Sequence, residues 1–149
     1  MFDPENPIVK LCAKGMELEA EFKAEEALQT FLQAWNGASD DFEKFTAAHY
    51  VARHQKTITG KLKWDSTALQ HALSINKNDV KTTYPSLYLN VAKGYEDLSD
   101  FENAKANYLL ALSFAHLLPG DGYGKMIKSG IERGLERISL KSGQNPALS

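Results

Sequence analysis

The sequence predicts an all-α protein built from repeated helical hairpins, and two observations carry this prediction. Apolar residues recur at i, i+3 and i+4 throughout the chain, whereas alternation of apolar and polar residues over the length of a strand is missing. Small residues also recur at matching places, because Ala34, Ala72 and Ala111 lie 38 and 39 residues apart. With 149 residues, 43% of them apolar and 24% charged, the chain has a globular composition, and we expect residues 1–149 to form one domain.

The first predicted hairpin covers about residues 8–38. Its stretch "LCAKGMELEAEFKAEEALQTFLQAW" (11–35) places small and apolar residues at helical offsets, namely Leu11, Gly15, Leu18, Ala27, Phe31 and Ala34. The glutamates of this stretch, Glu17, Glu19, Glu25 and Glu26, are interpreted as a solvated helix surface. Trp35, at its end, is expected to be a packing anchor, as is Trp64 farther along.

A looser second hairpin is expected over about 41–78. Asp40 followed by Glu43 is a capping signature at its start. Its two helical patterns are "AAHYVARHQ" (47–55) and "STALQHALSI" (66–75), which we expect to be linked by a turn around Gly60.

The third hairpin, about 85–118, has the clearest pattern. Pro85 suits the first turn of a helix, where its missing N–H costs nothing. Ser99 followed by Glu102 predicts a capping box at the start of the second helix. Two helices joined so tightly fold back on each other, and we expect Ala92 and Ala104 to lie where their axes cross closely, with aromatic rings filling the space beside them.

A capping helix is predicted over about 122–141. Asp121 can cap its start, and Ile127, Ile131, Leu135 and Ile138 form one apolar stripe. Gly130 and Gly134 flank this stripe and indicate close contact with a neighbouring helix. The tail, 142–149, is expected to fray.

Residues 85–118 resemble a tetratricopeptide repeat (TPR), a helix–turn–helix unit of about 34 residues. The residues that match its pattern are Tyr88, Val91, Ala92, Tyr95, Phe101, Ala104, Tyr108 and Ala111. The first hairpin matches moderately, with Lys14 at a place that is usually apolar, and the second has Gln55 at an expected aromatic place. The resemblance, over about 8–118, implies three TPR-like hairpins in a right-handed superhelix, with the first helix of each pair lining the concave face and the C-terminal helix as a cap.

The resemblance also implies where a peptide would bind. The concave positions are Val9, Cys12 and Met16 in the first hairpin, and in the other two His49, Tyr50, Arg53, Ser86, Leu89, Asn90 and Lys93. The Asn90 amide can both donate to and accept from an extended peptide, while Arg53 and Lys93 can pair with acidic groups. Alternatively, Asn90 ties neighbouring helices together. A clamp for chaperone C-termini is not expected, because four of the five matching places depart from the family's clamp; these five places are Cys12, Met16, Tyr50, Ser86 and Asn90.

Other classes of function find little support in the sequence. The net charge of −2 gives no field for nucleic acid, and no stretch is apolar enough for a membrane span or a signal peptide, so we expect a cytoplasmic protein. The lone Cys12 is expected to be a small buried residue. "GDGYGKM" (120–126) lacks the spacing, the hydroxyl residue and the preceding strand of a phosphate-binding loop, and is interpreted as a helix-to-helix turn. The histidines are scattered, so no metal or other cofactor is expected.

The sequence therefore predicts a non-catalytic scaffold that binds a peptide or protein segment of unidentified origin. A homo-oligomeric module, with a homodimer as its simplest form, is the alternative. A third candidate is an rRNA adenine methyltransferase, a name that small proteins similar to this one sometimes carry. Such enzymes have a doubly wound sheet, a Gly-rich turn and an Asn/Asp-Pro-Pro-aromatic loop, whereas this chain has no strand pattern and only Asn6-Pro7-Ile8 near a loop start, so we expect no such activity.

Overall fold

The computed structural model of the protein describes residues 3–144, with the backbone alone for 142–144. All regular structure within these residues is helical, which confirms the all-α class. The chain divides into two compact units, residues 1–75 and 76–149. No helix among the described residues has both the length and the apolar character needed to cross a bilayer.

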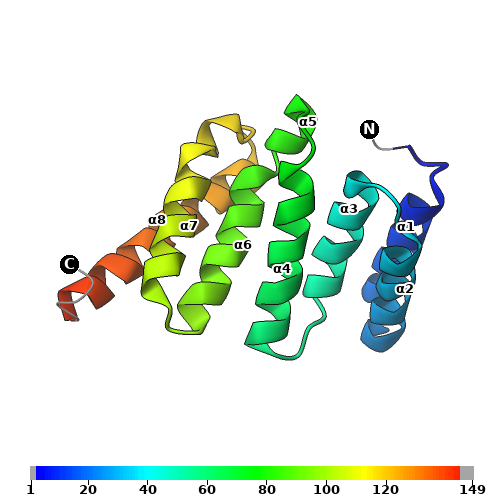
Figure 1. Cartoon of the computed structure of the whole chain (residues 1–149), viewed down its shortest axis with the longest axis horizontal. Helices are drawn as coiled ribbons and strands as arrows, with labels where there is room; N and C mark the ends of the chain where they lie inside the picture. The colour runs from blue at the N-terminus through cyan, green and yellow to red at the C-terminus, as the bar shows by residue number, and fades with distance from the viewer. Residues whose placement is uncertain (1–2, 145–149) are drawn as a thin grey trace. The chain divides into compact units, whose positions relative to one another are not determined.

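The first unit consists of two antiparallel hairpins (Figure 1). Its helices are α1 (Pro7–Ala20), α2 (Ala24–Gly37), α3 (Asp41–Ala52) and α4 (Ile58–Leu73). Helix α3 packs most extensively against its hairpin partner α4, and it also packs against α2 and touches α1, so a third helix covers the side of the first hairpin.

The caps of the first unit follow from its sequence. Asn6 Oδ1 accepts from the N–H groups of Ile8 and Val9 at the start of α1. The predicted cap at Asp40 is confirmed, because its side chain accepts from Glu43 N at 2.8 Å. The predicted turn around Gly60 is wrong: α3 ends at Ala52, and Gly60 lies in the first turn of α4, where its N–H donates to Thr57 Oγ1 at 2.9 Å. Thr57 is the N-cap that starts this helix eight residues before the pattern suggested.

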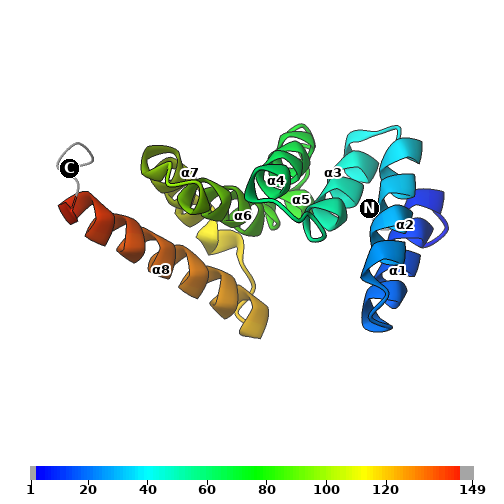
Figure 2. The same ribbon diagram turned by 90° about the horizontal axis from the view of Figure 1, so that it is seen from below.

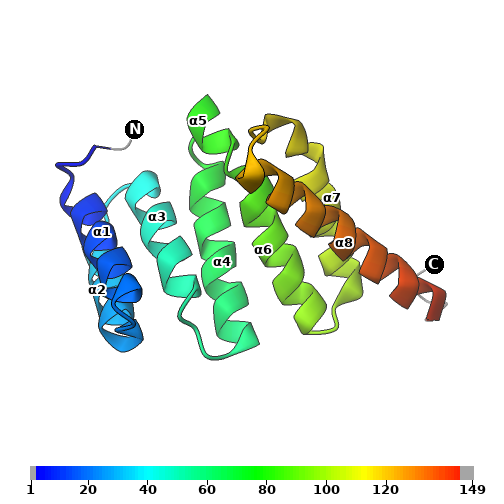
Figure 3. The same ribbon diagram turned by 180° about the vertical axis from the view of Figure 1, so that it is seen from behind.

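The second unit is a hairpin followed by a short turn and a long helix. Its elements are α5 (Asn78–Lys81), α6 (Tyr84–Asp97), α7 (Phe101–Ser113), the 3₁₀ turn η1 (Ala115–Leu117) and α8 (Gly122–Gln144). Helix α8 lies against α7 and also touches α6 (Figure 2; Figure 3). Pro85 lies in the first turn of α6, and Asp121 accepts from Gly124 N at the start of α8, as predicted. The helix continues past the predicted end at 141, so 142–144 are helical, and 145–149 lie outside the described residues.

The α1–α2 and α6–α7 hairpins have the same turn. Phe22 and Ser99 are both in the left-handed region, each with φ of 61°. The next residue donates its backbone N–H to the carbonyl five residues earlier in both, Lys23 to Leu18 and Asp100 to Tyr95, at 2.9 Å each. The predicted capping box at Ser99 is therefore wrong. Asp100 is the N-cap, and its side chain accepts from Asn103 N at 3.2 Å.

Small residues let the helices of each unit approach closely, as predicted. Ala92 and Ala104 are fully buried in one cluster with Tyr108. The ring of Tyr108 lies so close to Gly134 of α8 that a Cβ there would overlap it, and Gly15 of α1 faces Phe31 of α2 in the same way. Gly130 contacts Leu89, although less tightly.

Candidate functional site

The predicted site residues fall into one group on α3 and another on α6. His49 and Tyr50 lie on α3 of the first unit, with Arg53 at its C-cap, and Ser86, Leu89, Asn90 and Lys93 lie along α6 of the second. Contacts within each unit already occupy part of these side chains, and they determine which polar groups remain available to a ligand.

Tyr50 and Arg53 form a layered stack with the core of the first unit. The Tyr50 ring is half-buried and stacks on Phe31, with ring centroids 5.0 Å apart. The Arg53 guanidinium lies 5.1 Å from the Tyr50 centroid and donates to both carboxylate oxygens of Glu19, at 2.9 and 3.0 Å. Burial raises the pKa of Tyr50, so the phenol is neutral at ordinary pH.

Glu19 is a structural acid, which corrects its interpretation as solvated surface. Its side chain is only 18% exposed and accepts from Arg53, while its Oε2 lies 2.7 Å from His54 Nε2. Arg53 is therefore already paired with a carboxylate inside the first unit. A ligand acid would have to share its guanidinium with Glu19.

His49 is largely withdrawn from solvent. Its Nδ1 has no hydrogen-bond partner among the residues that the structure describes. Burial, with smaller effects from the nearby cations Arg53 and Lys61, lowers the pKa of His49 from 6.5 to about 4. The imidazole is neutral at pH 7 and adds no positive charge to this face.

Two of the α6 residues serve the helix or its packing. Ser86 Oγ donates to the carbonyl of Thr83 one turn earlier, at 3.0 Å. Leu89 packs against the cluster formed by Ala92, Tyr108 and their neighbours, and it fills the space that Gly130 leaves on α8. Leu89 therefore joins α6 to α8.

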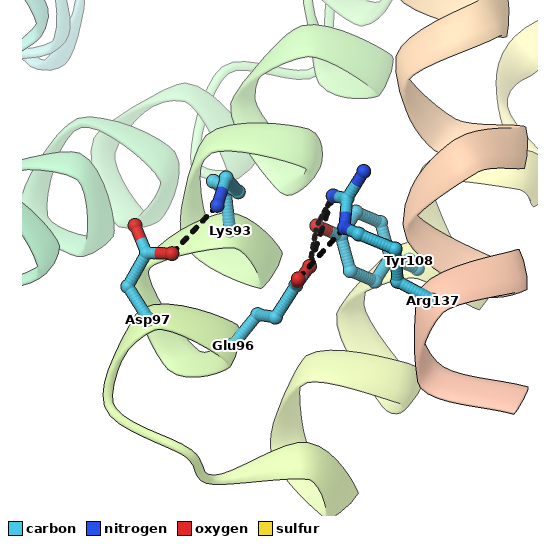
Figure 4. Close-up of polar contacts among 5 residues, drawn as sticks. All are labelled: Lys93, Glu96, Asp97, Tyr108 and Arg137. Carbon is cyan, nitrogen blue, oxygen red and sulfur yellow. Dashed lines mark hydrogen bonds and ion pairs between the residues drawn. The ribbon is translucent and has the colours of Figure 1, made fainter. Parts of the chain in front are cut away.

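The other two α6 residues keep more freedom. The Asn90 amide is half-buried and takes part in no side-chain hydrogen bond with the described part of the chain. Lys93 is about half-exposed, and its Nζ donates to Asp97 Oδ1 at 2.6 Å (Figure 4). An i, i+4 pair of this kind is weak, so Lys93 can turn to another acceptor at little cost.

Beside Lys93, a buried acid links α6, α7 and α8 of the second unit (Figure 4). Glu96 of α6 accepts from the Tyr108 hydroxyl of α7 at 2.7 Å, and Arg137 of α8 donates to its two oxygens at 2.8 and 3.0 Å. Burial alone would raise the pKa of Glu96, but the hydrogen bonds from Arg137 and Tyr108 outweigh it and hold the pKa below its usual value. Burial and the carboxylate raise the pKa of Tyr108.

The two units repeat this arrangement. Glu19 and Glu96 lie in the last turn of the first helix of their hairpins, α1 and α6. Each binds an arginine from the element that covers the hairpin, namely Arg53 at the C-cap of α3 and Arg137 of α8. The sequence analysis did not single out Glu96 or Arg137. The sequence did contain a hint that Glu96 matches Glu19. The two glutamates are 77 residues apart, which is also the separation of the matching residues Ala34 and Ala111.

The described residues offer little reactive chemistry elsewhere. Cys12 is buried, as predicted, and burial raises the pKa of its thiol to about 11. No group of three or more potential ligands among the described histidine, cysteine, aspartate and glutamate residues is arranged to hold a metal ion. The "GDGYGKM" stretch runs from the turn after η1 into the first turns of α8.

No protein-family model, no curated protein and no solved structure matches the chain. The resemblance to tetratricopeptide repeats therefore remains a prediction from the sequence.

Proposed function

We propose that the chain is a non-catalytic binding scaffold, a TPR-like superhelix of three hairpins and a capping helix that holds an extended peptide segment. The observation that carries this proposal is the exposed side of α6. There Asn90 and Lys93 lie one turn apart; the Asn90 amide has no side-chain partner among the described residues, and the Lys93 ammonium group is loosely paired.

The surroundings of these two residues favour a preorganised surface. Leu89 is wedged against Gly130, and Glu96 is tied to Arg137, so α6 is anchored on both sides of Asn90. A rigid helix loses little conformational entropy on binding. An amide that both donates and accepts fits the N–H and C=O groups of an extended backbone, while Lys93 favours an acidic side chain nearby.

The other predicted contacts carry a smaller share of this proposal. Arg53 is already bound by Glu19, His49 is neutral, and Leu89 is part of the packing. We therefore expect peptide recognition to depend on Asn90 and Lys93 more than on the residues of α3.

The test is a screen of a random peptide library against the full chain, followed by calorimetry with the selected peptides. Asn90→Ala should weaken peptide binding about 5- to 150-fold and leave the melting temperature unchanged. Asn107→Ala is the matched control, since that half-buried amide donates to the Asn103 carbonyl of its own helix. If Asn90→Ala lowers the melting temperature but leaves binding intact, Asn90 is structural and the proposed surface is wrong.

A separate titration addresses the enzymatic alternative. We expect no heat of specific binding from S-adenosylmethionine or ATP, and micromolar binding of either would replace the scaffold proposal by an enzymatic one.

A further inference from the structure

Phe22 is exposed to a degree that the fold of its unit does not explain. Its side chain is 95% exposed, at the tip of the α1–α2 hairpin. Its φ of 61° is unfavourable for a bulky residue. The matching turn of the second unit has Ser99 with the same φ, so the turn itself needs no aromatic ring. A strained, solvent-exposed phenylalanine contributes nothing to the core and points to a role outside the fold.

A pocket of about 500 Å³ opens beside this turn. It is lined by Ala24, Glu25, Glu26, Leu28, Gln29, His54 and Lys56, that is, by the first turns of α2 and the loop after α3. Both segments lie at the same end of the first unit as the α1–α2 turn (Figure 1). The volume is within the range of about 300–1,000 Å³ typical of binding pockets, and Ala24 begins α2 only two residues after Phe22.

We propose that the occupant of this pocket is Phe22 of a second copy of the chain. A projecting ring and a pocket next to each other on one end of a molecule are self-complementary. A two-fold axis places each ring in the pocket of the other copy, which makes two identical contacts at once and closes the assembly. This reciprocity favours a second copy over an unrelated protein, which would need both a ring and a pocket of its own to make the two contacts.

The charged residues around the pocket are also compatible with the pairing of two copies. Its rim carries Glu25 and Glu26 together with Lys56; Glu26 interacts with Lys23 of its own copy, whereas Glu25 and Lys56 have no ion-pair partner in the described part of the chain. Opposed copies bring acids of one rim toward the lysine of the other. An interface restricted to one end of a small unit is below the standard size, so the dimer is weak and depends on concentration.

Sedimentation velocity of the full chain tests this dimer at protein concentrations from about 10 to about 500 μM. Wild type should shift from monomer to dimer across this range. Phe22→Ser should weaken the dimer roughly 100-fold, because each dimer loses two buried rings. Its melting temperature should stay equal or rise, as Ser99 predicts for this turn.

Matched variants isolate the contact. Leu98→Ser removes an exposed apolar side chain at the equivalent turn of the second unit and should leave dimerisation unchanged. Gln29→Trp fills the pocket from its exposed rim and should also abolish the dimer. A mixture of Phe22→Ser, which keeps the pocket, with Gln29→Trp, which keeps the ring, restores one contact and should associate more strongly than either variant alone.

Three results would overturn the proposal: a wild-type chain that stays monomeric up to the highest concentration, a Phe22→Ser variant that dimerises like wild type, or a mixture that associates no better than its components. The dimer is independent of peptide binding on α6. Asn90→Ala should therefore leave sedimentation unchanged, so failure of one proposal does not imply failure of the other.

Discussion

At the scale of single residues, His49 shows how a neutral buried base sets the response to acid. Its folded pKa of about 4 is below the value of about 6.5 in the unfolded chain. As pH falls below 6.5, the unfolded state takes up the proton first, and unfolding becomes easier until about pH 4. The contribution of His49 to stability is thus fully present above pH 6.5 and is lost between pH 6.5 and 4.

The variant His49→Leu should remove this part of the pH dependence. Between pH 7.5 and 4.5 we expect wild type to lose about 2–3 kcal/mol more unfolding free energy than the variant. Urea unfolding at the two pH values measures this difference. Equal losses in both proteins would mean that His49 is accessible to protons in the folded state.

The hydroxyl of Tyr108 is a second group whose contribution to the free energy of unfolding can be measured by removing a single atom. Tyr108→Phe removes the donor to Glu96, and Phe31 at the matching place in the first unit shows that a ring without a hydroxyl fits such a site. We expect a loss of about 1–2 kcal/mol in unfolding free energy by chemical denaturation. Tyr95→Phe is the control from the same cluster, because its hydroxyl has no partner in the described part of the chain, and it should cost less.

At the scale of elements, α8 depends on the two glycines that face the α6–α7 hairpin. The two glycines differ in the atoms that the added methyl group of an alanine would contact. At Gly134 it would overlap the ring of Tyr108, which is held on all sides, whereas at Gly130 it would lie 3.1 Å from the flexible tip of Leu89. Alanine also favours a helix over glycine by about 1 kcal/mol, and this gain opposes the crowding.

Gly134→Ala should therefore destabilise the protein by about 2 kcal/mol, whereas Gly130→Ala should be neutral or slightly stabilising. Thermal and urea unfolding of the two variants measure this contrast. Similar stability of both would show that α8 can shift away from Tyr108 without cost.

The elements also show where a sequence pattern stops being informative. Apolar spacing predicted each hairpin and the close approach of Ala92 and Ala104, because these depend on periodicity alone. It misplaced the cap at Ser99, since Ser99–Glu102 and Asp100–Asn103 are both plausible capping pairs and only the turn, with its bond from Asp100 N to Tyr95 O, decides between them. It likewise assigned Glu19 to solvent, because one helix's pattern does not reveal that Arg53 lies across from it.

At the scale of the whole molecule, the chain is two units, each with its own buried clusters. The first contains Phe31 and Val51 in its core, and the second contains Tyr108 and Ile138. The sequence predicted the all-α class and the hairpins, because both depend on local spacing, whereas a repeat pattern gives no measure of the contacts between successive hairpins. Of the predicted site, it placed Asn90 and Lys93 on a helix surface but did not foresee the partners of Arg53 and Leu89.

Because the two units have separate cores, we expect a destabilising substitution in one unit to increase local unfolding in that unit first. In hydrogen exchange, Gly134→Ala should lower the protection of amides in α6, α7 and α8 more than that of amides in α1 to α4. An equal loss of protection along the whole chain would mean that the two units unfold as one.

Cys12 gives the first unit a built-in reporter of such openings. It is the single cysteine of the chain, it is 4% exposed, and its thiol is protonated well above neutral pH. Since only an exposed thiolate reacts with disulfide reagents, the rate of thiol labelling counts excursions in which α1 leaves its neighbours. The second unit contains no cysteine, so one colorimetric trace follows the opening of the first unit alone, with no label introduced.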